Sequence, residues 1–415
     1  TMKKLVYLII FFLYSTVMNA QLKDLVQYVN TLQGTDSNFG LSYGNTYPTT
    51  GMPYGMHMWS AQTGKNGDGF KYMYAVDKIR AFSQSHQCSP WVSDYAVYSF
   101  MPMVGELVVN QNARATKFSH DNEIAKPHYY KVTFDNGITT EMAPTTRGVH
   151  LRFSYPTTGD AYLVLDGYTD MSEIKIDPAK RQISGWVNNQ RFVNDSKSFR
   201  NYFVVQFDKS FEDYGVWENQ KDEVFPQKLD GSGKGYGAFI KFKKGSKVQA
   251  KAASSYISAE QALITLNKEL GKDKNLEVTK ARGQKTWNEV LNRIVVEGCT
   301  DEQMKTFYSC LFRANLFSRK FYERKENGEP YYYSPYNGKI YDGYMYTDNG
   351  FWDTFRSQFP LTNILHPTMQ GRYMNALLAA QEQCGWLPSW SSPGETGGML
   401  GLSLIHISEP TRLRC

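Results

Sequence analysis

The sequence is poor in cysteine and lacks the short motifs that mark several common enzyme classes. Its 415 residues include five cysteines and no CxxC pair. No zinc site can be read from such wide spacings, which fit one disulfide as well as buried free thiols. No P-loop, HExxH, Gly-x-Ser-x-Gly, EF-hand or glycine-rich dinucleotide pattern occurs. The cysteines are Cys88, Cys299, Cys310, Cys384 and Cys415.

Charge of one sign is not concentrated anywhere in the chain. The formal net charge is +6, but the charged residues are interspersed, and no Lys/Arg stripe carries interleaved aromatic residues. The sequence therefore predicts no nucleic-acid partner. Aromatic residues make up 15% of the chain. Such rings either fill cores or stack on the apolar faces of sugars.

The two ends of the chain differ from its middle. Residues 1–20 are typical of a signal peptide, because two lysines precede the apolar run Leu5–Leu13, which is too short to span a bilayer, and Ala20 precedes the expected cleavage point. The alternative is a membrane anchor. We expect a secreted or periplasmic protein with no membrane insertion after cleavage. Residues 402–415 show no useful periodicity and are expected to be a non-native tail.

Residues 21–258 have the pattern of an all-β domain. Short runs rich in β-branched and aromatic residues, such as Tyr129–Phe134 and Tyr236–Phe242, alternate with clusters of Gly, Asn, Asp and Pro. The Asp-Asn-Gly sequence at 135–137 predicts a tight turn, because Asn and Gly tolerate positive φ. This spacing of strands and turns predicts a β-sandwich.

The pattern then becomes helical. Ala259–Leu270 has helical apolar spacing, with Ser258 as a candidate N-cap and Gly271 as a stop signal. Val278–Val290 predicts a second helix. The two helices would form a linker over residues 259–298.

Residues 299–401 are expected to begin a helical domain. Helices are predicted over Asp301–Arg319 and from about Thr368 to Gln383. The fold class is therefore mixed, with a β domain first and an α domain after it.

Four segments rich in Gly, Pro and Trp are candidates for function. Three of them lie in predicted loops or at element ends, where functional residues concentrate. The first is expected to be a long loop without helix or strand. The segments are Gly40–Met58, Ser85–Tyr95, Asp348–Arg356 and Gly385–Gly401.

The side chains in these segments suit a sugar site, which needs stacking rings beside polar groups that bind hydroxyls. Each also has a structural alternative. His86 could be a core histidine that is hydrogen-bonded within the protein, and the Asp–Arg pair in Asp348–Arg356 could be a surface ion pair that adds little stability. Glu395 could be a solvated residue in a loop between helices. The glutamate is a candidate hydroxyl or metal ligand. The candidate substrate-binding residues are His86, Gln87, Trp91, Trp352, Asp353 and Glu395.

Taken together, the four segments resemble glycoside hydrolase family 92. The similarity covers nearly all of residues 21–401 and includes the stretches GNTYPTTGMPYGM, SHQCSPWVSDY, FWDTFR and LPSWSSPGETGGM. The resemblance implies an N-terminal β-sandwich packed on an (α/α)6 barrel, of which residues 299–401 would be the first part. It also implies removal of terminal α-mannose from N-glycans or mannans, by inversion and with a Ca2+ ion.

The resemblance implies roles for individual residues. Trp352 and Asp353 match a Trp–Asp pair that contacts the terminal mannose, and the His86–Trp91 loop matches a sandwich loop that reaches the same sugar. The catalytic acid, the base and most calcium ligands are expected beyond the end of this chain, which would be inactive alone. The Ser-Pro-Trp form of the second segment favours α1,2 linkages, whereas Cys88 departs from the proline common at its position.

Two other functions remain open from the sequence. One is a carbohydrate-binding protein without catalysis, and the other is a different glycosidase that combines a sandwich with a helical barrel. The FWDTFR and GETGGM stretches favour family 92 over the latter. Oligomeric state cannot be read from the sequence.

Overall fold

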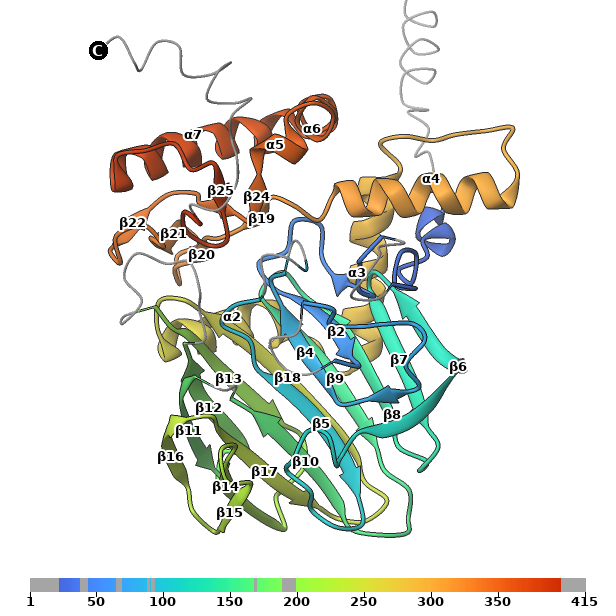
Figure 1. Cartoon of the computed structure of the whole chain (residues 1–415), viewed down its shortest axis with the longest axis vertical. Coiled ribbons are helices and arrows are strands. Elements are labelled where there is room, and N and C mark those ends of the chain that lie inside the picture. The colour runs from blue at the N-terminus through green and yellow to red at the C-terminus, as the bar shows by residue number, and fades with distance from the viewer. Residues whose placement is uncertain are drawn as a thin grey trace, which may run out of the picture.

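The computed structural model describes residues 22–37, 44–64, 69–87, 90, 94–167, 170–188 and 199–396. In this part of the chain, strands dominate up to residue 255, and helices follow (Figure 1). The predicted order of a β-rich domain before a helical region is confirmed. No described helix combines the length and apolar character needed to cross a membrane.

Two antiparallel sheets form the first domain. One has eight strands, in the order β1 (Thr50–Gly51), β2 (Met58–Gln62), β4 (Ala81–Ser85), β5 (Ser99–Val104), β10 (Ala161–Asp166), β17 (Tyr236–Phe242), β14 (Asp213–Glu218) and β15 (Glu223–Pro226). The other has ten, in the order β16 (Asp230–Lys234), β11 (Met171–Asp177), β12 (Gln182–Val187), β13 (Asn201–Phe207), β18 (Lys247–Ser255), β9 (Gly148–Ser154), β8 (Thr139–Pro144), β7 (Tyr129–Phe134), β6 (Thr116–Lys126) and β3 (Lys78–Ile79).

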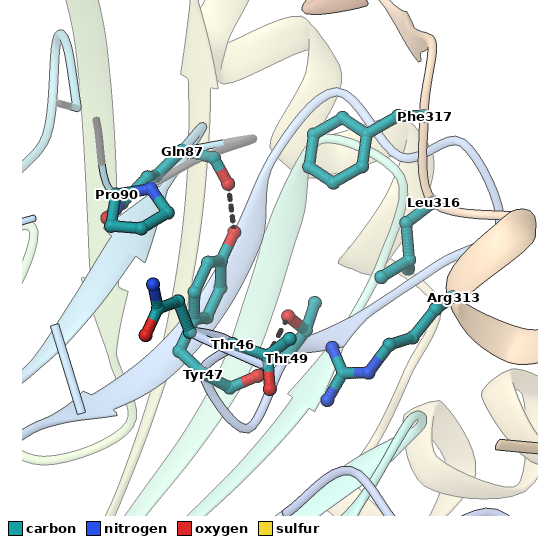
Figure 2. A pocket seen from close by; sticks show the side chains of 9 residues that line it. Thr46, Tyr47, Thr49, Gln87, Pro90, Arg313, Leu316 and Phe317 are labelled. Atoms are coloured by element: carbon teal, nitrogen blue, oxygen red, sulfur yellow. Dashed lines mark hydrogen bonds between the residues drawn. The ribbon is translucent and has the colours of Figure 1, made fainter. Parts of the chain in front are cut away.

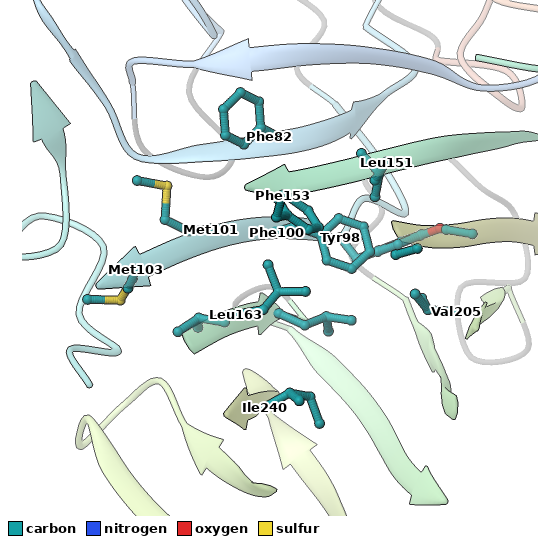
Figure 3. Packing of buried hydrophobic residues seen from close by; sticks show 14 of the residues in the cluster. Phe82, Tyr98, Phe100, Met101, Met103, Leu151, Phe153, Leu163, Val205 and Ile240 are labelled. Atoms are coloured by element: carbon teal, nitrogen blue, oxygen red, sulfur yellow. The ribbon is translucent and has the colours of Figure 1, made fainter. Parts of the chain in front are cut away.

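The main core lies between these two sheets. Figure 3 shows Phe100 and Leu163 of the eight-stranded sheet near Leu151, Phe153 and Val205 of the ten-stranded sheet, and all five side chains are buried. Because side chains alternate along a strand, each strand sends every second residue into this layer. Burying one such side chain contributes about 1.5–3 kcal/mol. The sandwich therefore has a core of its own.

The tight turn at 135–137 is confirmed. It joins β7 to β8, and Gly137 takes a φ of +86°, where a residue without a Cβ has no steric penalty. The amide of Gly137 donates to the carbonyl of Phe134 at 2.9 Å. The turn thereby sets the register in which Thr133 faces Thr139.

Helix α2 (Ala259–Leu270) has the predicted bounds and N-cap. The Ser258 hydroxyl accepts a hydrogen bond from the Gln261 amide at 3.1 Å, which satisfies one of the free donors of the first turn. Helix α3 (Leu276–Leu291) covers the predicted second helix. Both helices pack on the ten-stranded sheet, α2 on β18 and β13 and α3 on β8 and β9. They therefore cover the sandwich as well as leading out of it.

Helix α4 (Asp301–Ala314) ends five residues before the predicted Arg319. Asn315 terminates it, because the Asn315 side-chain amide donates to the Leu311 carbonyl at 2.8 Å and its own carbonyl accepts from Tyr54 N. The chain then extends into β19 (Arg319–Lys320). The apolar face of α4 packs against α3 and the short helix η1 (Leu25–Tyr28).

The remaining elements form small sheets under three helices. The predicted second helix of this region is α7, and Gly385 ends it with a φ of +84°. The elements are β20 (Glu323–Arg324), β21 (Pro330–Tyr333), β22 (Ile340–Asp342), β23 (Tyr346–Thr347), β24 (Asn349–Gly350), α5 (Phe351–Thr354), α6 (Gln358–Leu365), α7 (Pro367–Cys384) and β25 (Trp390–Ser391).

One face of α7 and the end of α6 expose apolar side chains. Leu378 is 59% exposed, Met374 38% and Ile364 76%, whereas Ala376 and Ala380 on the opposite side of α7 are buried. Residues 374 and 378 are one helical turn apart and share a face. Contiguous apolar surface of this kind favours association.

We expect the double variant Met374→Lys/Leu378→Lys to reduce self-association without changing stability. Exposed side chains contribute little, so the free energy of unfolding should stay within about 0.5 kcal/mol of wild type. Light scattering and urea denaturation measure the two quantities. The control Ala376→Lys buries a charge and should destabilise strongly. A large stability loss in the double variant would show that this face is covered in solution.

Candidate functional site

A buried aspartate, Asp94, binds both ends of the second segment. Asp94 accepts hydrogen bonds from the amides of His86 and Tyr95, each at 2.9 Å, and from the Ser85 hydroxyl at 2.9 Å. Lys71 lies 3.0 Å from the same carboxylate, and both side chains are buried. The two ends of the loop 86–94 are therefore held together at one ionised group, which fixes where the loop leaves β4.

His86 is a buried support of this loop. Its Nδ1 lies 2.6 Å from the Tyr95 carbonyl, which only accepts, so Nε2 accepts from His57 Nδ1 at 2.7 Å and from the Tyr256 hydroxyl at 3.1 Å. Burial holds the pKa of His86 and of His57 well below the usual value, so both rings are neutral. The His86 side chain is fully buried. In this part of the chain it packs as a buried core histidine would, and its predicted contact with a sugar stays a prediction.

Gln87 lines a cavity. Its Nε2 donates to the Gly69 carbonyl, and its backbone carbonyl accepts from the Tyr47 hydroxyl at 2.7 Å. The side-chain oxygen Oε1 is buried and has no hydrogen-bond partner among the residues that the structure describes. Trp91 and Cys88 lie outside the described residues.

The cavity has a volume of about 190 Å3 and lies where the sandwich meets the end of α4. Figure 2 shows Gln87 and Pro90 on one side, Arg313 on another, and Leu316 with Phe317 on a third. The loop before β1 completes the wall with Asn45, Thr46, Tyr47 and Thr49. The first segment is not purely a loop, because it contains β1 and the first residue of β2.

The third and fourth segments lie side by side. Strands β24 and β25 pair antiparallel, with Gly350 opposite Trp390. A Cβ at position 350 would come within 2.3 Å of the Trp390 ring, so only glycine permits this approach. The pairing places the turn that carries Trp352 and Asp353 beside the loop that carries Glu395.

Trp352 and Asp353 are accessible at the start of α5. The Trp352 side chain is 39% exposed, and the Arg356 guanidinium lies 5.1 Å from its ring centroid, a distance at which a cation is attracted to the ring face. Partial burial raises the pKa of Asp353 above its usual value, and Arg356 opposes that shift. Arg356 therefore lies against the ring of Trp352, which is next to Asp353 in the chain.

Glu395 organises its own loop. Its carboxylate accepts from the Ser389 amide at 2.9 Å and from the Ser389 hydroxyl at 3.1 Å. It also sits at a β-bridge to Ser391. Each carboxylate oxygen thus accepts one hydrogen bond from Ser389, and the role of Glu395 in substrate binding stays a prediction.

All four segments meet at one buried ion pair, Arg319–Asp348. Both side chains are fully buried. Arg319 donates to the Met56 carbonyl, to the Tyr95 hydroxyl and to Asp348. Asp348 also accepts from Tyr95 at 2.8 Å and from the Ser392 hydroxyl at 2.9 Å. One residue from each segment thus contributes to a single network.

The sequence did not indicate Arg319 as a site residue. It lies 29 positions from its partner, so no helical or strand spacing links the two. A left-handed backbone at Asp348, with φ of +59°, aims the carboxylate inward and has no reliable sequence signature. The surrounding sequence, LFRANLFSRKFY, contains three charged residues, so nothing in it marks Arg319.

The described residues do not form a metal site. No group of three or more His, Cys, Asp or Glu side chains among them is arranged to hold an ion. The Asp348 and Glu395 carboxylates are engaged by protein donors. The calcium implied by the sequence resemblance stays a prediction.

A further buried carboxyl lies between the two domains. Glu323 Oε1 accepts from the Tyr256 amide at 2.8 Å, while Oε2 has no partner among the described residues. Burial raises the pKa of Glu323 to about 7, against partial opposition from Ser255, Tyr256 and Arg147. Tyr256 in turn contacts His86, so this carboxyl belongs to the support of the site.

Comparison with known proteins identifies the family. Residues 28–255 match the glycosyl hydrolase family 92 N-terminal domain, and residues 261–407 match the glycosyl hydrolase family 92 catalytic domain. The second match extends into the segment 402–415. The chain belongs to glycoside hydrolase family 92.

Solved structures agree with this assignment. The inverting family GH92 mannosidase BT2199 from Bacteroides thetaiotaomicron is 43% identical, with a TM-score of 0.88 over 90% of this chain and 51% of that one. The α-mannosidase BT3965 from the same species shares the fold, at 23% identity and a TM-score of 0.80 over 91% and 52% of the two chains.

A curated relative is more distant. An uncharacterized secreted glycosidase from Arthroderma benhamiae is 21% identical over 75% of this chain and 44% of its own length. The chain thus spans about half the length of the relatives that it matches.

We expect Arg319→Met and Asp348→Asn each to destabilise the protein by about 3–5 kcal/mol, because each leaves an unpaired buried polar or charged group. Urea denaturation measures the loss. The control Lys23→Met breaks a pair whose side chains are 53% and 78% exposed, and because water solvates and screens such a pair, the loss should be far smaller. Equal losses for the buried and exposed pairs would contradict the central role of Arg319.

The contribution of Glu323 to the stability of the protein should fall as pH rises from 4.5 to 7. In that window the folded state keeps the Glu323 proton and the unfolded state, with the ordinary pKa of 4.5, does not. The titration of Glu323 should lower the free energy of unfolding by about 3 kcal/mol at pH values above 7. Glu323→Gln should remove that loss, and Glu329→Gln, at a 65% exposed side chain, should not. Denaturation at several pH values decides between these outcomes, and an unchanged pH profile in Glu323→Gln would refute the assignment.

Proposed function

We propose that this chain forms the N-terminal, substrate-contacting part of a glycosidase that removes terminal α-linked mannose from glycans by inversion. The observation that carries the proposal is the 43% identity to an inverting family GH92 mannosidase over 90% of the chain. The accessible Trp352–Asp353 pair at the domain junction supports it.

In this proposal Trp352 and Asp353 make different contacts with the sugar. The exposed Trp352 ring offers a flat apolar face to the CH groups of a pyranose. The neighbouring Asp353 carboxylate accepts hydrogen bonds from hydroxyls, and charge-assisted bonds of this kind are stronger than neutral ones. Arg356, at 5.1 Å from the Trp352 ring centroid, limits the rotation of that ring. In this proposal a terminal sugar stacks one face of its ring on Trp352 and donates hydrogen bonds from its hydroxyls to Asp353.

Inverting hydrolysis needs an acid and a base about 6.5–9.5 Å apart on opposite faces of the sugar. Asp348 is bound to Arg319, and Glu395 is bound to Ser389. Neither carboxylate is available for proton transfer in this arrangement. We therefore assign the acid and base to residues outside the described part of the protein, and assign binding and positioning to the residues described above.

Calcium dependence is part of the proposal and rests on membership of the family. The substrates are mannose-containing glycans of the N-glycan or mannan type, with a preference for α1,2 linkages. Secretion is supported by the signal-like N-terminus and by similarity to a secreted glycosidase.

Asp353→Asn should weaken binding of methyl α-mannoside by about ten- to a hundredfold, since it removes a hydrogen bond to a charged group. Trp352→Ala should weaken it through loss of stacking. The matched control is Asp342→Asn, whose carboxylate pairs with Lys325 at the surface. Isothermal titration of the 415-residue chain measures the effect. Equal affinities for wild type and Asp353→Asn would exclude this contact.

Expression with the downstream coding sequence tests catalysis. The longer product should hydrolyse aryl α-mannosides with inversion, lose activity in EDTA and regain it with calcium. Hydrolysis of aryl α-glucosides alone would assign the protein to another substrate class.

A further inference from the structure

A second cavity, of about 220 Å3, lies between α2 and the start of the second domain. Helix α2 and strand β20 lie side by side here (Figure 1), and Gln261 of α2 donates to the Arg324 carbonyl at 2.9 Å. A cavity of about 150 Å3 can hold a benzene ring, so a tetrahedral oxyanion fits with room for a small substituent. The lining consists of Arg147 from the turn between β8 and β9, Thr265, Lys268 and Glu269 from α2, and Arg324 from β20.

The lining carries more positive than negative charge. Arg147, Lys268 and Arg324 are cations, and Glu269 is the one carboxylate among the described lining residues. Both Glu269 oxygens accept from Arg147, one from its backbone amide at 2.8 Å and the other from Nη1 at 2.9 Å. Glu269 therefore compensates Arg147, which leaves the charges of Lys268 and Arg324 to be balanced by another group.

Lys268 and Arg324 are hydrogen-bonded to neutral carbonyls. Lys268 Nζ donates to the carbonyls of Lys325 and Glu326, each at 2.6 Å, and Arg324 Nη1 donates to the Gly328 carbonyl at 2.8 Å. No carboxylate of the described residues lies within 4.0 Å of either cation. Because an ammonium and a guanidinium have more donors than these bonds use, both keep N–H groups for a ligand.

The two guanidinium groups are held in place beside the cavity. Arg147 is buried, and its Nε and Nη2 donate to the Tyr322 carbonyl at 3.0 and 2.7 Å. The Arg324 guanidinium lies 5.6 Å from the ring centroid of Tyr322 and 5.9 Å from that of Tyr344, distances at which a cation is attracted to an aromatic ring. Burial, with smaller contributions from Arg147 and Arg324, lowers the pKa of the neighbouring Lys320 to about 8. The positive charge of the lining thus extends to a buried neighbour.

The hydroxyl of Thr265 adds a neutral donor to the lining. Thr265 is buried, and its Oγ1 accepts a hydrogen bond from Gln261 Nε2 at 3.2 Å. That bond uses a lone pair of the oxygen, so the hydroxyl proton can be donated to an acceptor in the cavity. The polar part of the lining therefore favours a ligand that is negatively charged and rich in acceptors.

From this arrangement we propose that the cavity binds a tetrahedral dianion, phosphate or sulfate, either free or as the monoester of a small molecule. Two cations without a carboxylate partner match a ligand with about two negative charges near pH 7. Guanidinium and ammonium groups form charge-assisted bonds to such oxygens, and Thr265 donates to a further one. A carboxylate would balance only one of the two charges, and a neutral sugar neither. The bound anion joins α2 to β20 and so stabilises the contact between the two domains.

Isothermal titration of the 415-residue chain with sodium phosphate and sodium sulfate, at an ionic strength held constant with sodium chloride, tests the proposal. We expect saturable binding of one anion per chain, with acetate bound about tenfold more weakly because it carries one charge. Arg324→Met and Lys268→Gln should each weaken phosphate binding by about tenfold or more, since each removes a hydrogen bond from a charged donor.

Glu269→Gln tests the charge in the opposite direction. It keeps an acceptor for Arg147 and removes the negative charge of the described lining, so phosphate should bind about threefold more tightly or better. The matched control is Arg181→Met, which removes an arginine whose Nη1 also donates to a backbone carbonyl, that of Asp208, outside the cavity lining. It should leave phosphate binding unchanged. Urea denaturation of every variant confirms that each is folded at the titration temperature.

Glycerol phosphate separates the two sources of the anion. Tighter binding of this monoester than of inorganic phosphate assigns the cavity to an ester, and weaker binding assigns it to the free ion. Three results would overturn the proposal: no saturable binding of any of these anions, equal weakening by Arg181→Met and Arg324→Met, or acetate bound as tightly as phosphate. The last would make the cavity a carboxylate site. None of the variants changes Trp352 or Asp353, so the outcome is independent of the proposed mannose contact.

Discussion

The Arg319–Asp348 ion pair is the contact on which the arrangement of the site depends. A guanidinium and a carboxylate taken out of water carry a large desolvation penalty, which is offset only when their remaining hydrogen-bonding capacity is used. Here most of the required groups come from separate loops: the Met56 carbonyl, the Tyr95 hydroxyl and the Ser392 hydroxyl, while Arg319 Nε has no partner among the described residues. Displacing any one loop leaves a buried charge less solvated. The loops are therefore coupled energetically although no regular element joins them.

This coupling explains which polar residues are available to a ligand. His86 and Glu395 both hydrogen-bond to protein groups, and His86 is buried. Asp353 is accessible, and Gln87 keeps one acceptor unused beside a cavity. Ligand binding belongs to groups with unused capacity, because satisfied groups would have to break a protein bond first. The candidate site therefore combines residues that hydrogen-bond mainly within the protein, such as His86, with the more accessible groups of Asp353 and Gln87.

Local features of the fold could be predicted from the sequence, and long-range ones could not. Ser258 as an N-cap, the turn at 135–137 and the stop at Gly385 are set by neighbouring residues, so the predicted elements match the structure. The end of α4 could not be predicted, because helical spacing continues past Asn315 and contacts distant in sequence stop the helix there. For the same reason composition identified His86 as polar and loop-borne but could not show that Tyr95, His57 and Tyr256 enclose it.

The junction between the domains gives the support of the site its rigidity. Arg147 of the sandwich donates to the Tyr322 carbonyl and pairs with Glu269 of α2. Tyr256, just after β18, joins Glu323 through its amide and His86 through its hydroxyl. The contacts of Arg147 with Tyr322 and of Tyr256 with Glu323 tie the first domain to the start of the second, whereas the contact with His86 lies within the first domain. Because the open groups Gln87 and Asp353 lie in different domains, their relative position is fixed only as well as this junction is fixed. A ligand that contacts both would bind most tightly to the packed arrangement and would stabilise the junction in return.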